Sequence, residues 1–339
     1  MRADRLVGPE SSTDRAQAVR FEGVPLRIVF AGTPAAAVPS LRLLAASGHE
    51  IVAVVTRPDA RVGRGRREQP SEIAAAAAEL GLPVVKAANA RDPWFTEVLP
   101  GLGVQLGVVV AYGALIPPAI LEIPTQGWIN LHFSLLPAWR GAAPVQAAIR
   151  AGDEITGASV FQLEAGLDTG PVFGTITAGI PPAATAGELL ETLAHSGSRL
   201  LASVVEGIAA GTLQARSQPA DGVSVVGKIT VDDARIDWAA PALAIDRLVR
   251  AMTPAPGAWT DSPWGRLQLG PVQLTDGTGL APGEIRPGKR EVLVGTGSQA
   301  IRLGDVRAPG RKPMAAADWA RGTRPEPGTL LGTSTGGDR

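Results

Sequence analysis

The 339-residue chain carries 32 acidic and 32 basic residues, is 45% hydrophobic and contains no cysteine. Its length fits two domains, and its apolar content is high enough for folded cores, which argues against a disordered protein. Without cysteine it has no disulfide framework and no thiolate nucleophile, and its three histidines (His49, His132 and His195) stand in no zinc-ligand spacing. We therefore expect no metal cofactor and a cytoplasmic location.

Residues 1–24 are polar and mixed in charge, and they lack the apolar stretch of a signal peptide. We expect a disordered extension there, or residues read from an upstream start codon. The best candidate for a membrane span, residues 104–121, is interrupted by Gln105, two glycines, Pro117 and Pro118. This pattern predicts a buried strand and loop, and no membrane partner.

Strands alternate with helical segments from Leu26 onward. Continuous apolar runs predict buried strands at residues 26–31, 51–56, 83–86, 106–111 and 128–132. Amphipathic stretches predict helices at residues 38–46, 72–80 and 187–210. The alternation is typical of a doubly wound, mostly parallel α/β sheet, which we assign to residues 25–212. Ligands of such sheets bind at the carboxyl ends of the strands.

After residue 212 the composition and the hydrophobic pattern of the chain change. Residues 213–227 are polar and contain glycine and proline, so we expect a linker. From Lys228 onward, apolar residues such as Leu267 and Leu269 alternate with polar ones between Gly and Pro turns. This pattern predicts a small antiparallel β-barrel over residues 228–330, with a tail at residues 331–339.

Three polar residues stand out as candidates for chemistry. Asn130 and His132 share one face at the end of a predicted strand, because side chains alternate with a period of two. Asp168 lies on a glycine-flanked loop that could approach both. A single histidine at a strand end is usually structural, as we expect for His49 and His195, but the three residues together favour a catalytic site.

The surrounding motif carries a resemblance. Asn130-x-His132 is followed by Ser-Leu-Leu-Pro at residues 134–137, and Leu-Asp-Thr-Gly follows at residues 167–170. This combination, over a stretch from Leu26 to near the end, resembles the folate-dependent formyltransferase family. The resemblance implies a Rossmann-like catalytic domain that uses 10-formyltetrahydrofolate as formyl donor.

The same resemblance implies roles for these residues. The Asn130 amide and a protonated His132 would donate hydrogen bonds to the formyl oxygen as negative charge develops on it, each bond contributing about 3–4 kcal/mol. Asp168 would favour the imidazolium and pass protons from the attacking amine to the leaving folate nitrogen. The folate pocket would be formed by the segment of residues 134–137 and by the strand end at residues 108–113, that is, by Ser134, Leu135, Leu136, Pro137, Tyr112 and Gly113.

The acceptor is indicated by a basic loop. Residues 57–67 contain five arginines against Asp59, a net charge of +4. The stretch of residues 58–65 resembles the tRNA-binding inserted loop of methionyl-tRNA formyltransferases. That resemblance implies initiator methionyl-tRNA as partner, with tRNA contacts from Arg57, Arg61, Arg64, Arg66 and Arg67. Residues 228–230, 234–238 and 253–259 resemble the C-terminal domain of the same enzymes, which implies an OB-like barrel that binds tRNA, with Lys228 among its contacts.

Two alternatives remain open. An amino-sugar N-formyltransferase would keep Asn130, His132 and Asp168 but would need no arginine loop. A folate- or RNA-binding protein without catalysis would have no use for the three polar residues. No obligate protein partner is predicted.

Overall fold

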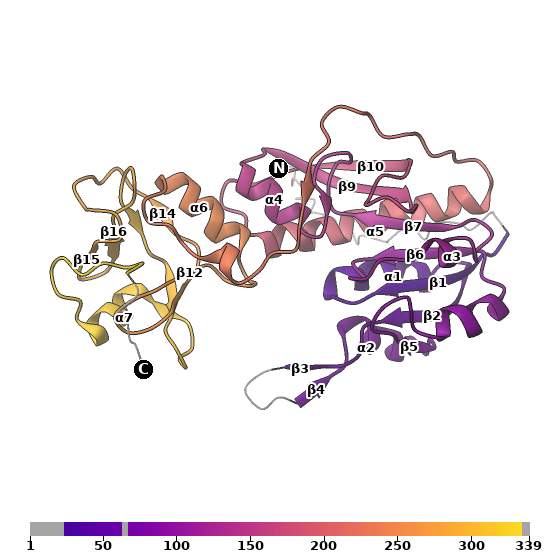
Figure 1. Cartoon of the computed structure of the whole chain (residues 1–339), viewed down its shortest axis with the longest axis horizontal. Coiled ribbons are helices and arrows are strands. Elements are labelled where there is room, and N and C mark those ends of the chain that lie inside the picture. The colour runs from indigo at the N-terminus through magenta and orange to yellow at the C-terminus, as the bar shows by residue number, and fades with distance from the viewer. Residues whose placement is uncertain (1–23, 63–66, 334–339) are drawn as a thin grey trace, which may run out of the picture.

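The computed structural model describes residues 24–62 and 67–333. Two bodies lie side by side along the long axis (Figure 1). The first is built on a seven-stranded sheet in the order β10-β9-β7-β6-β1-β2-β5. Its strands are β1 (Arg27–Gly32), β2 (Glu50–Thr56), β5 (Val84–Lys86), β6 (Leu106–Val110), β7 (Trp128–His132), β9 (Ile155–Gln162) and β10 (Val172–Gly179). Strands β5, β2, β1, β6 and β7 run parallel to one another. Strand β9 is antiparallel to both of its neighbours, β7 and β10. The predicted mostly parallel sheet is therefore confirmed.

Both faces of this sheet are covered. One apolar cluster joins the strands to the helices α1 (Val38–Ala45), α2 (Glu72–Glu79) and α5 (Ala186–Ala209). A second cluster, on the other face, contains side chains from α3 (Pro118–Leu121) and from the turns Trp94–Val98 and Leu99–Leu102. The doubly wound arrangement is therefore also confirmed. A short turn (Ala35–Ala37) leads into α1, and α4 (Pro144–Ala151) precedes β9.

The alternation of β7 sets the direction of its polar side chains. Ile129 and Leu131 belong to the first cluster, whereas Trp128 belongs to the second. Asn130 and His132 therefore share the Trp128 face of the sheet. Strand β7 lies between β6 and β9, so the end of β7 is flanked by backbone on both sides.

Two segments predicted as irregular have regular structure. The arginine loop is part of a hairpin of β3 (Ala60–Val62) and β4 (Arg67–Gln69), which projects from the first body (Figure 1). The expected linker is tied to the catalytic domain, because β11 (Val225–Val226) pairs in parallel with β8 (Arg140–Gly141). The expected N-terminal extension lies outside the described residues except for Val24.

The second body contains two four-stranded antiparallel sheets, in the orders β12-β13-β18-β19 and β14-β17-β16-β15. Its strands are β12 (Trp259–Thr260), β13 (Leu267–Leu269), β14 (Gln273–Leu274), β15 (Ile285–Pro287), β16 (Val292–Val294), β17 (Ile301–Arg302), β18 (Asp305–Arg307) and β19 (Met314–Ala315). The predicted antiparallel domain is confirmed, but three helical segments were not predicted. These are a turn (Asp232–Ala234), α6 (Ala242–Ala251) and α7 (Ala316–Thr323). Helix α6 is amphipathic, with Ile245 and Val249 four residues apart on its buried side.

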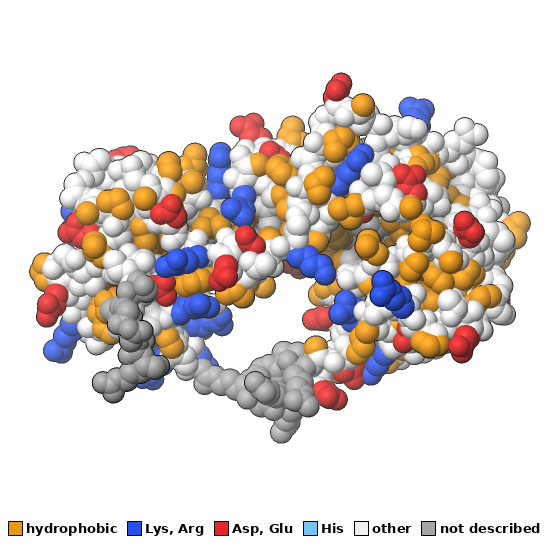
Figure 2. All heavy atoms as spheres, viewed as in Figure 1, with side chains coloured by type: hydrophobic (Ala, Val, Ile, Leu, Met, Phe, Trp, Pro, Cys, Tyr) orange, Lys and Arg blue, Asp and Glu red, His pale blue; other side chains and the backbone are white. Residues whose placement is uncertain are grey.

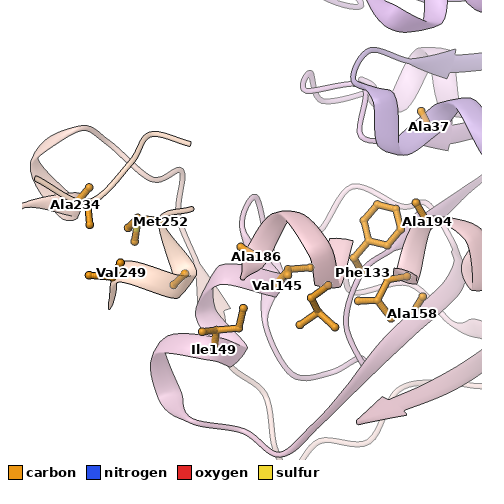
Figure 3. Close-up of a cluster of buried hydrophobic side chains, with 14 of the residues drawn as sticks. Ala37, Phe133, Val145, Ile149, Ala158, Ala186, Ala194, Ala234, Val249 and Met252 are labelled. Atoms are coloured by element: carbon orange, nitrogen blue, oxygen red, sulfur yellow. The ribbon is translucent and has the colours of Figure 1, made fainter. Parts of the chain in front are cut away.

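The two bodies share apolar packing. Figure 3 shows Val145 and Ile149 of α4 near Val249 and Met252, and all four side chains belong to one buried cluster. Arg247 adds a hydrogen bond from Nη1 to the carbonyl oxygen of Ala151 (3.3 Å), at the end of α4. Figure 2 shows a hollow between the bodies with Lys and Arg side chains along its border. Within the described ranges, no helix has the length and apolar character needed to cross a bilayer.

Candidate active site

The three predicted catalytic residues meet at the carboxyl end of β7. Asn130 and His132 come from the strand itself, and Asp168 comes from the loop between β9 and β10. The Asp168 backbone has φ +51°, a left-handed conformation that is uncommon for a residue with a side chain. His132 Nδ1 lies 3.7 Å from Asp168 Oδ2. The sequence motif thus converges in space, at the sheet edge where ligands of such folds bind.

The His132 imidazole is held in one orientation. Its Nε2 lies 2.9 Å from the carbonyl oxygen of Trp139, and its ring meets the ring of Phe161 edge-on, with centroids 6.3 Å apart. A carbonyl oxygen can only accept a hydrogen bond, so Nε2 carries the proton. Nδ1 is therefore the nitrogen that faces Asp168 and is open to exchange protons.

Burial changes the expected charge of this group. The side chain is almost fully enclosed, and desolvation lowers the pKa of His132, while the Asp168 carboxylate and the Trp139 hydrogen bond act in the opposite direction. The net direction is downward, so the resting imidazole is neutral at pH 7. This differs from the expected imidazolium, because the sequence does not reveal that Phe161 and its neighbours remove water from the ring.

Asn130 has an unused polar atom. Its Oδ1 is buried, and no hydrogen-bond partner for it is present in the described part of the chain. Neighbouring residues in the sheet are Val109 on β6 and Phe161 on β9, neither of which has a polar side chain. A buried amide in such surroundings is normally satisfied by a ligand or water, so Asn130 is available to a bound substrate.

The Asp168 carboxylate is fixed by a residue that sequence reasoning missed. Asp168 Oδ2 accepts a hydrogen bond from the backbone N–H of Gly141 (2.7 Å). Gly141 has φ +113°, and a Cβ at this position would overlap the carbonyl oxygen of Val226. Only glycine fits this combination of backbone angle and close approach. The close approach of Gly141 to Val226 depends on the pairing of β8 with β11, 85 residues further along the chain. No local sequence pattern indicates this pairing.

The Ser-Leu-Leu-Pro segment is held from within. Ser134 is fully buried, and its hydroxyl donates to the carbonyl oxygen of Ala138 (2.6 Å). Ser159 on β9 donates to the Ser134 carbonyl (2.7 Å) and accepts from the Leu136 N–H (3.1 Å). The Ser134 side chain therefore shapes the loop instead of facing outward. Leu135 and Pro137 are partly exposed beside the site.

Tyr112, predicted to line the folate pocket, has a buried side chain. Its side chain is 1% exposed in the second cluster, with Oη donating to the Ala87 carbonyl (3.1 Å), and burial raises its pKa to about 12. The preceding Ala111 has φ +49°, which breaks the alternation of β6 and turns the ring inward. Gly113, with φ +82°, remains at the surface, where its carbonyl oxygen accepts a hydrogen bond from Arg57 Nη1 (3.3 Å).

The predicted tRNA-binding residues fall into three groups. Arg57 is exposed beside Gly113, and Lys228 is exposed just after the segment that joins the two bodies. Arg61 is in β3, opposite Glu68, and Arg67 is in β4, opposite Val62. Arg64 and Arg66 lie outside the described residues.

Two family models match this chain. One, described as formyl transferase, covers residues 26–205, and the other, described as formyl transferase, C-terminal domain, covers residues 228–324. The first alone spans more than half of the sequence. The chain belongs to the formyl transferase family. The family that the motif predicted is thus confirmed.

Individual relatives agree with this assignment. The chain is 57% identical to a methionyl-tRNA formyltransferase of Nocardioides sp. over 92% of this chain and 99% of the relative. It is also 57% identical to a methionyl-tRNA formyltransferase of Streptomyces coelicolor, over 91% and 100% respectively. Both relatives therefore align over their whole length with this formyl transferase.

Solved structures share the fold at low identity. HypX from Aquifex aeolicus in complex with tetrahydrofolic acid matches with a TM-score of 0.61 and 16% identity, over 88% of this chain and 47% of HypX. An N-formyltransferase from Helicobacter canadensis, in complex with folinic acid and dTDP-3-aminofucose, matches with a TM-score of 0.62 and 16% identity, over 82% and 98%. This chain spans about half the length of HypX.

Proposed function

We propose that this formyl transferase moves the formyl group of 10-formyltetrahydrofolate to the α-amino group of methionyl initiator tRNA, in the cytoplasm, for translation initiation. The observation that carries the proposal is the full-length identity of 57% to methionyl-tRNA formyltransferases. The geometry at the end of β7 supports it, since it brings together an amide whose oxygen is buried and unpartnered in the described part of the chain, a neutral imidazole and a carboxylate.

In the proposed reaction, His132 Nδ1 accepts a proton from the amine as the amine nitrogen bonds to the formyl carbon. The Asn130 side-chain N–H groups stabilise the negative charge that develops on the formyl oxygen. Asp168 lies 3.7 Å from Nδ1 and stabilises the imidazolium while it exists. His132 then returns the proton to the folate nitrogen as the bond from that nitrogen to the formyl carbon breaks, which leaves tetrahydrofolate and the formylated amine.

Folate would bind beside the catalytic residues, between the loop of residues 134–137 and the end of β6. Leu135 and Pro137 offer apolar surface, with Leu136 buried between them, and the Gly113 backbone allows close approach. Ser134 and Tyr112 would contribute as buried supports of these two loops, because both side-chain oxygens already bond to backbone carbonyls.

The tRNA would lie across the hollow between the two bodies, with its acceptor end directed to β7. The β3–β4 hairpin, with its arginines, projects from the catalytic body, and Lys228 begins the second body. Accordingly, residues 25–212 would form the catalytic domain and residues 228–330 a tRNA-binding domain, joined by residues 213–227. A small amine acceptor would not need the basic hairpin.

A formylation assay on the purified chain tests the proposal. Charged initiator tRNA, charged elongator tRNA, free methionine and a nucleotide-linked amino sugar are supplied side by side with the same folate donor. We expect formylation of charged initiator tRNA at least a hundredfold above the other acceptors. Preferential formylation of the amino sugar would contradict the proposal and would establish the alternative activity.

A further inference from the structure

Gln218 lies in the segment between the domains and forms hydrogen bonds with two loops of the active site, one containing Arg140 and the other containing Asp168. Its Nε2 donates hydrogen bonds to the carbonyl oxygens of Asp168 and Gly170, each at 2.8 Å. Its Oε1 accepts from Nε (3.2 Å) and Nη2 (2.7 Å) of Arg140. One partly buried amide thus uses both donors and its acceptor on the two loops that form the catalytic site.

The carbonyls that Gln218 binds belong to a backbone that needs support. Asp168 has φ +51°, and left-handed conformations of residues with side chains cost free energy unless their surroundings hold them. The two bonds from Nε2 fix the peptide group between Asp168 and Thr169 and the peptide group between Gly170 and Pro171. They therefore resist relaxation of this loop to the more common φ.

Arg140 completes a closed path of contacts. Its neighbour Gly141 donates its N–H to Asp168 Oδ2 (2.7 Å), and Gln218 joins Arg140 back to the Asp168 backbone. The Arg140 N–H donates to the Ser224 carbonyl (2.9 Å), so the same loop is paired with the inter-domain segment a second time. Any movement of Gln218 would displace the carboxylate and its backbone donor together.

We propose that Gln218 is a positioning residue, which holds the Asp168 carboxylate beside His132 and makes the inter-domain segment part of the active site. Its amide touches neither substrate nor the reacting atoms, and it acts through the Asp168 loop. The kinetic consequence rests on the proposed function, whereas the effect on His132 is a property of the free protein.

Two substitutions separate the two halves of the Gln218 contact. Gln218→Met keeps the length of the side chain but removes its donors and its acceptor. Gln218→Glu keeps an acceptor for Arg140 but removes the donors to Asp168 and Gly170. As a matched control, Gln105→Met alters a partly buried glutamine whose Oε1 accepts from the Arg27 backbone N–H (3.0 Å) at the opposite end of the sheet.

The expected result is a loss of turnover without loss of binding. In both Gln218 variants kcat should fall roughly tenfold to a hundredfold while KM for folate and for charged tRNA stays within about twofold, because a misplaced catalytic group lowers turnover more than affinity. The thermal unfolding midpoint reports separately on the fold. Gln105→Met should keep wild-type kcat.

NMR titration of the imidazole gives a readout that a purely structural role would not change. The chain has three histidines, and His132→Asn identifies the His132 signal. The Asp168 carboxylate raises the pKa of His132 against burial, so Gln218→Met should lower that pKa further as the carboxylate moves away.

Three outcomes would overturn the proposal. The first is wild-type kcat together with an unchanged His132 titration in Gln218→Met. The second is wild-type behaviour of Gln218→Glu, which would assign the role to the Arg140 contact alone. The third is a lower kcat with no change in the titration. If the wild-type chain formylates no acceptor at all, the proposed function fails, and the titration alone decides the role of Gln218.

Discussion

The end of β7 and the β3–β4 hairpin differ in how many polar residues they carry and in how those residues are held. At β7, a few polar groups are enclosed, and each has a fixed direction: the His132 side chain is 5% exposed and is oriented by the Trp139 carbonyl. The hairpin is a two-stranded ribbon that projects from the body and carries a dense set of arginines. Burial makes single contacts strong and directional, whereas exposed charges are screened and act by number. Changes at β7 should therefore alter turnover, and changes in the hairpin should alter affinity and its salt dependence.

The largest effects are expected from the three residues at the β7 end. Asn130→Ala, His132→Ala and Asp168→Ala should each lower kcat at least a hundredfold, equivalent to about 2.7 kcal/mol, because each removes a group that acts on the transition state. Single-turnover formylation with saturating folate and charged tRNA measures this loss. Circular dichroism checks that the variants fold, and near wild-type turnover in a folded variant would remove that residue from the mechanism.

Gly141→Ala should be the next most damaging change. The added Cβ would meet the Val226 carbonyl at a φ that favours glycine, so we expect a loss of roughly 1–3 kcal/mol in the free energy of unfolding together with lower kcat. Gly81→Ala is the matched control, since Gly81 also has positive φ (+68°) but open space around it. Equal effects of the two changes on stability and kcat would show that the contact between Gly141 and Val226 is unimportant.

The prediction of the site succeeded where the signal was local. Asn130 and His132 are two residues apart on a continuous apolar strand, and strand alternation alone puts them on one face. Asp168 was found through its motif, although its position depends on the pairing of β9 with β7. Gly141 and Gln218 were missed because their roles depend on contacts across 27 and 50 residues, with no periodicity in either segment.

The prediction of the fold succeeded and failed for similar reasons. The parallel strands were identified because both of their faces are buried, which gives unbroken apolar runs. Strand β10 alternates between partly buried and exposed residues at the sheet edge, and its pattern is weak. Tyr112 was predicted to line the folate pocket, but the left-handed turn at Ala111 reverses the alternation of β6, and the side chain is buried in the second cluster.

The arginines of the hairpin should have moderate effects, and on binding more than on chemistry. Replacing Arg57, Arg61, Arg66 and Arg67 by Ala should raise KM for charged tRNA while leaving KM for folate unchanged. Each phosphate contact that is lost should reduce the slope of log K against log salt by about 0.7–0.9. Arg64→Ala should also lower turnover, since a misplaced methionine amine reaches the formyl carbon less often.

A comparison across the surface sharpens this test. Arg42 on α1 is an exposed arginine, paired with Glu79 at 2.6 Å, and Arg42→Ala removes the same charge away from the hairpin. It should leave both KM and the salt slope unchanged. If replacement of Arg57 and the four hairpin arginines together has no larger effect than Arg42→Ala, these arginines do not bind tRNA, and the amino-sugar alternative gains support.

The smallest predicted effect concerns pH and the enclosed histidines. Burial lowers the pKa of His132 and also that of His49, whose Nδ1 accepts from the Leu26 N–H (3.2 Å) near Glu206. In the unfolded chain both imidazoles titrate near their ordinary value of about 6.5. As pH falls through that value, the unfolded chain takes up protons that the folded chain does not. The free energy of unfolding should therefore decrease, by at most about 1.4 kcal/mol per pH unit for each histidine.

Denaturant titrations at pH 7.5, 6.5 and 5.5 measure this slope, and His49→Gln and His132→Asn should each flatten it. Glu188 and Asp233 do not interfere, because hydrogen bonds from Thr185 and Thr230 lower the pKa values of their carboxyl groups. The stability that these carboxylates contribute is present above their unfolded pKa values near 4 and is lost only at lower pH. A slope that becomes steeper in His132→Asn, instead of flatter, would mean that the pKa of His132 in the folded chain lies above its unfolded value. Asp168 would then outweigh burial, and His132 would start the reaction as a hydrogen-bond donor to the formyl oxygen instead of as a base.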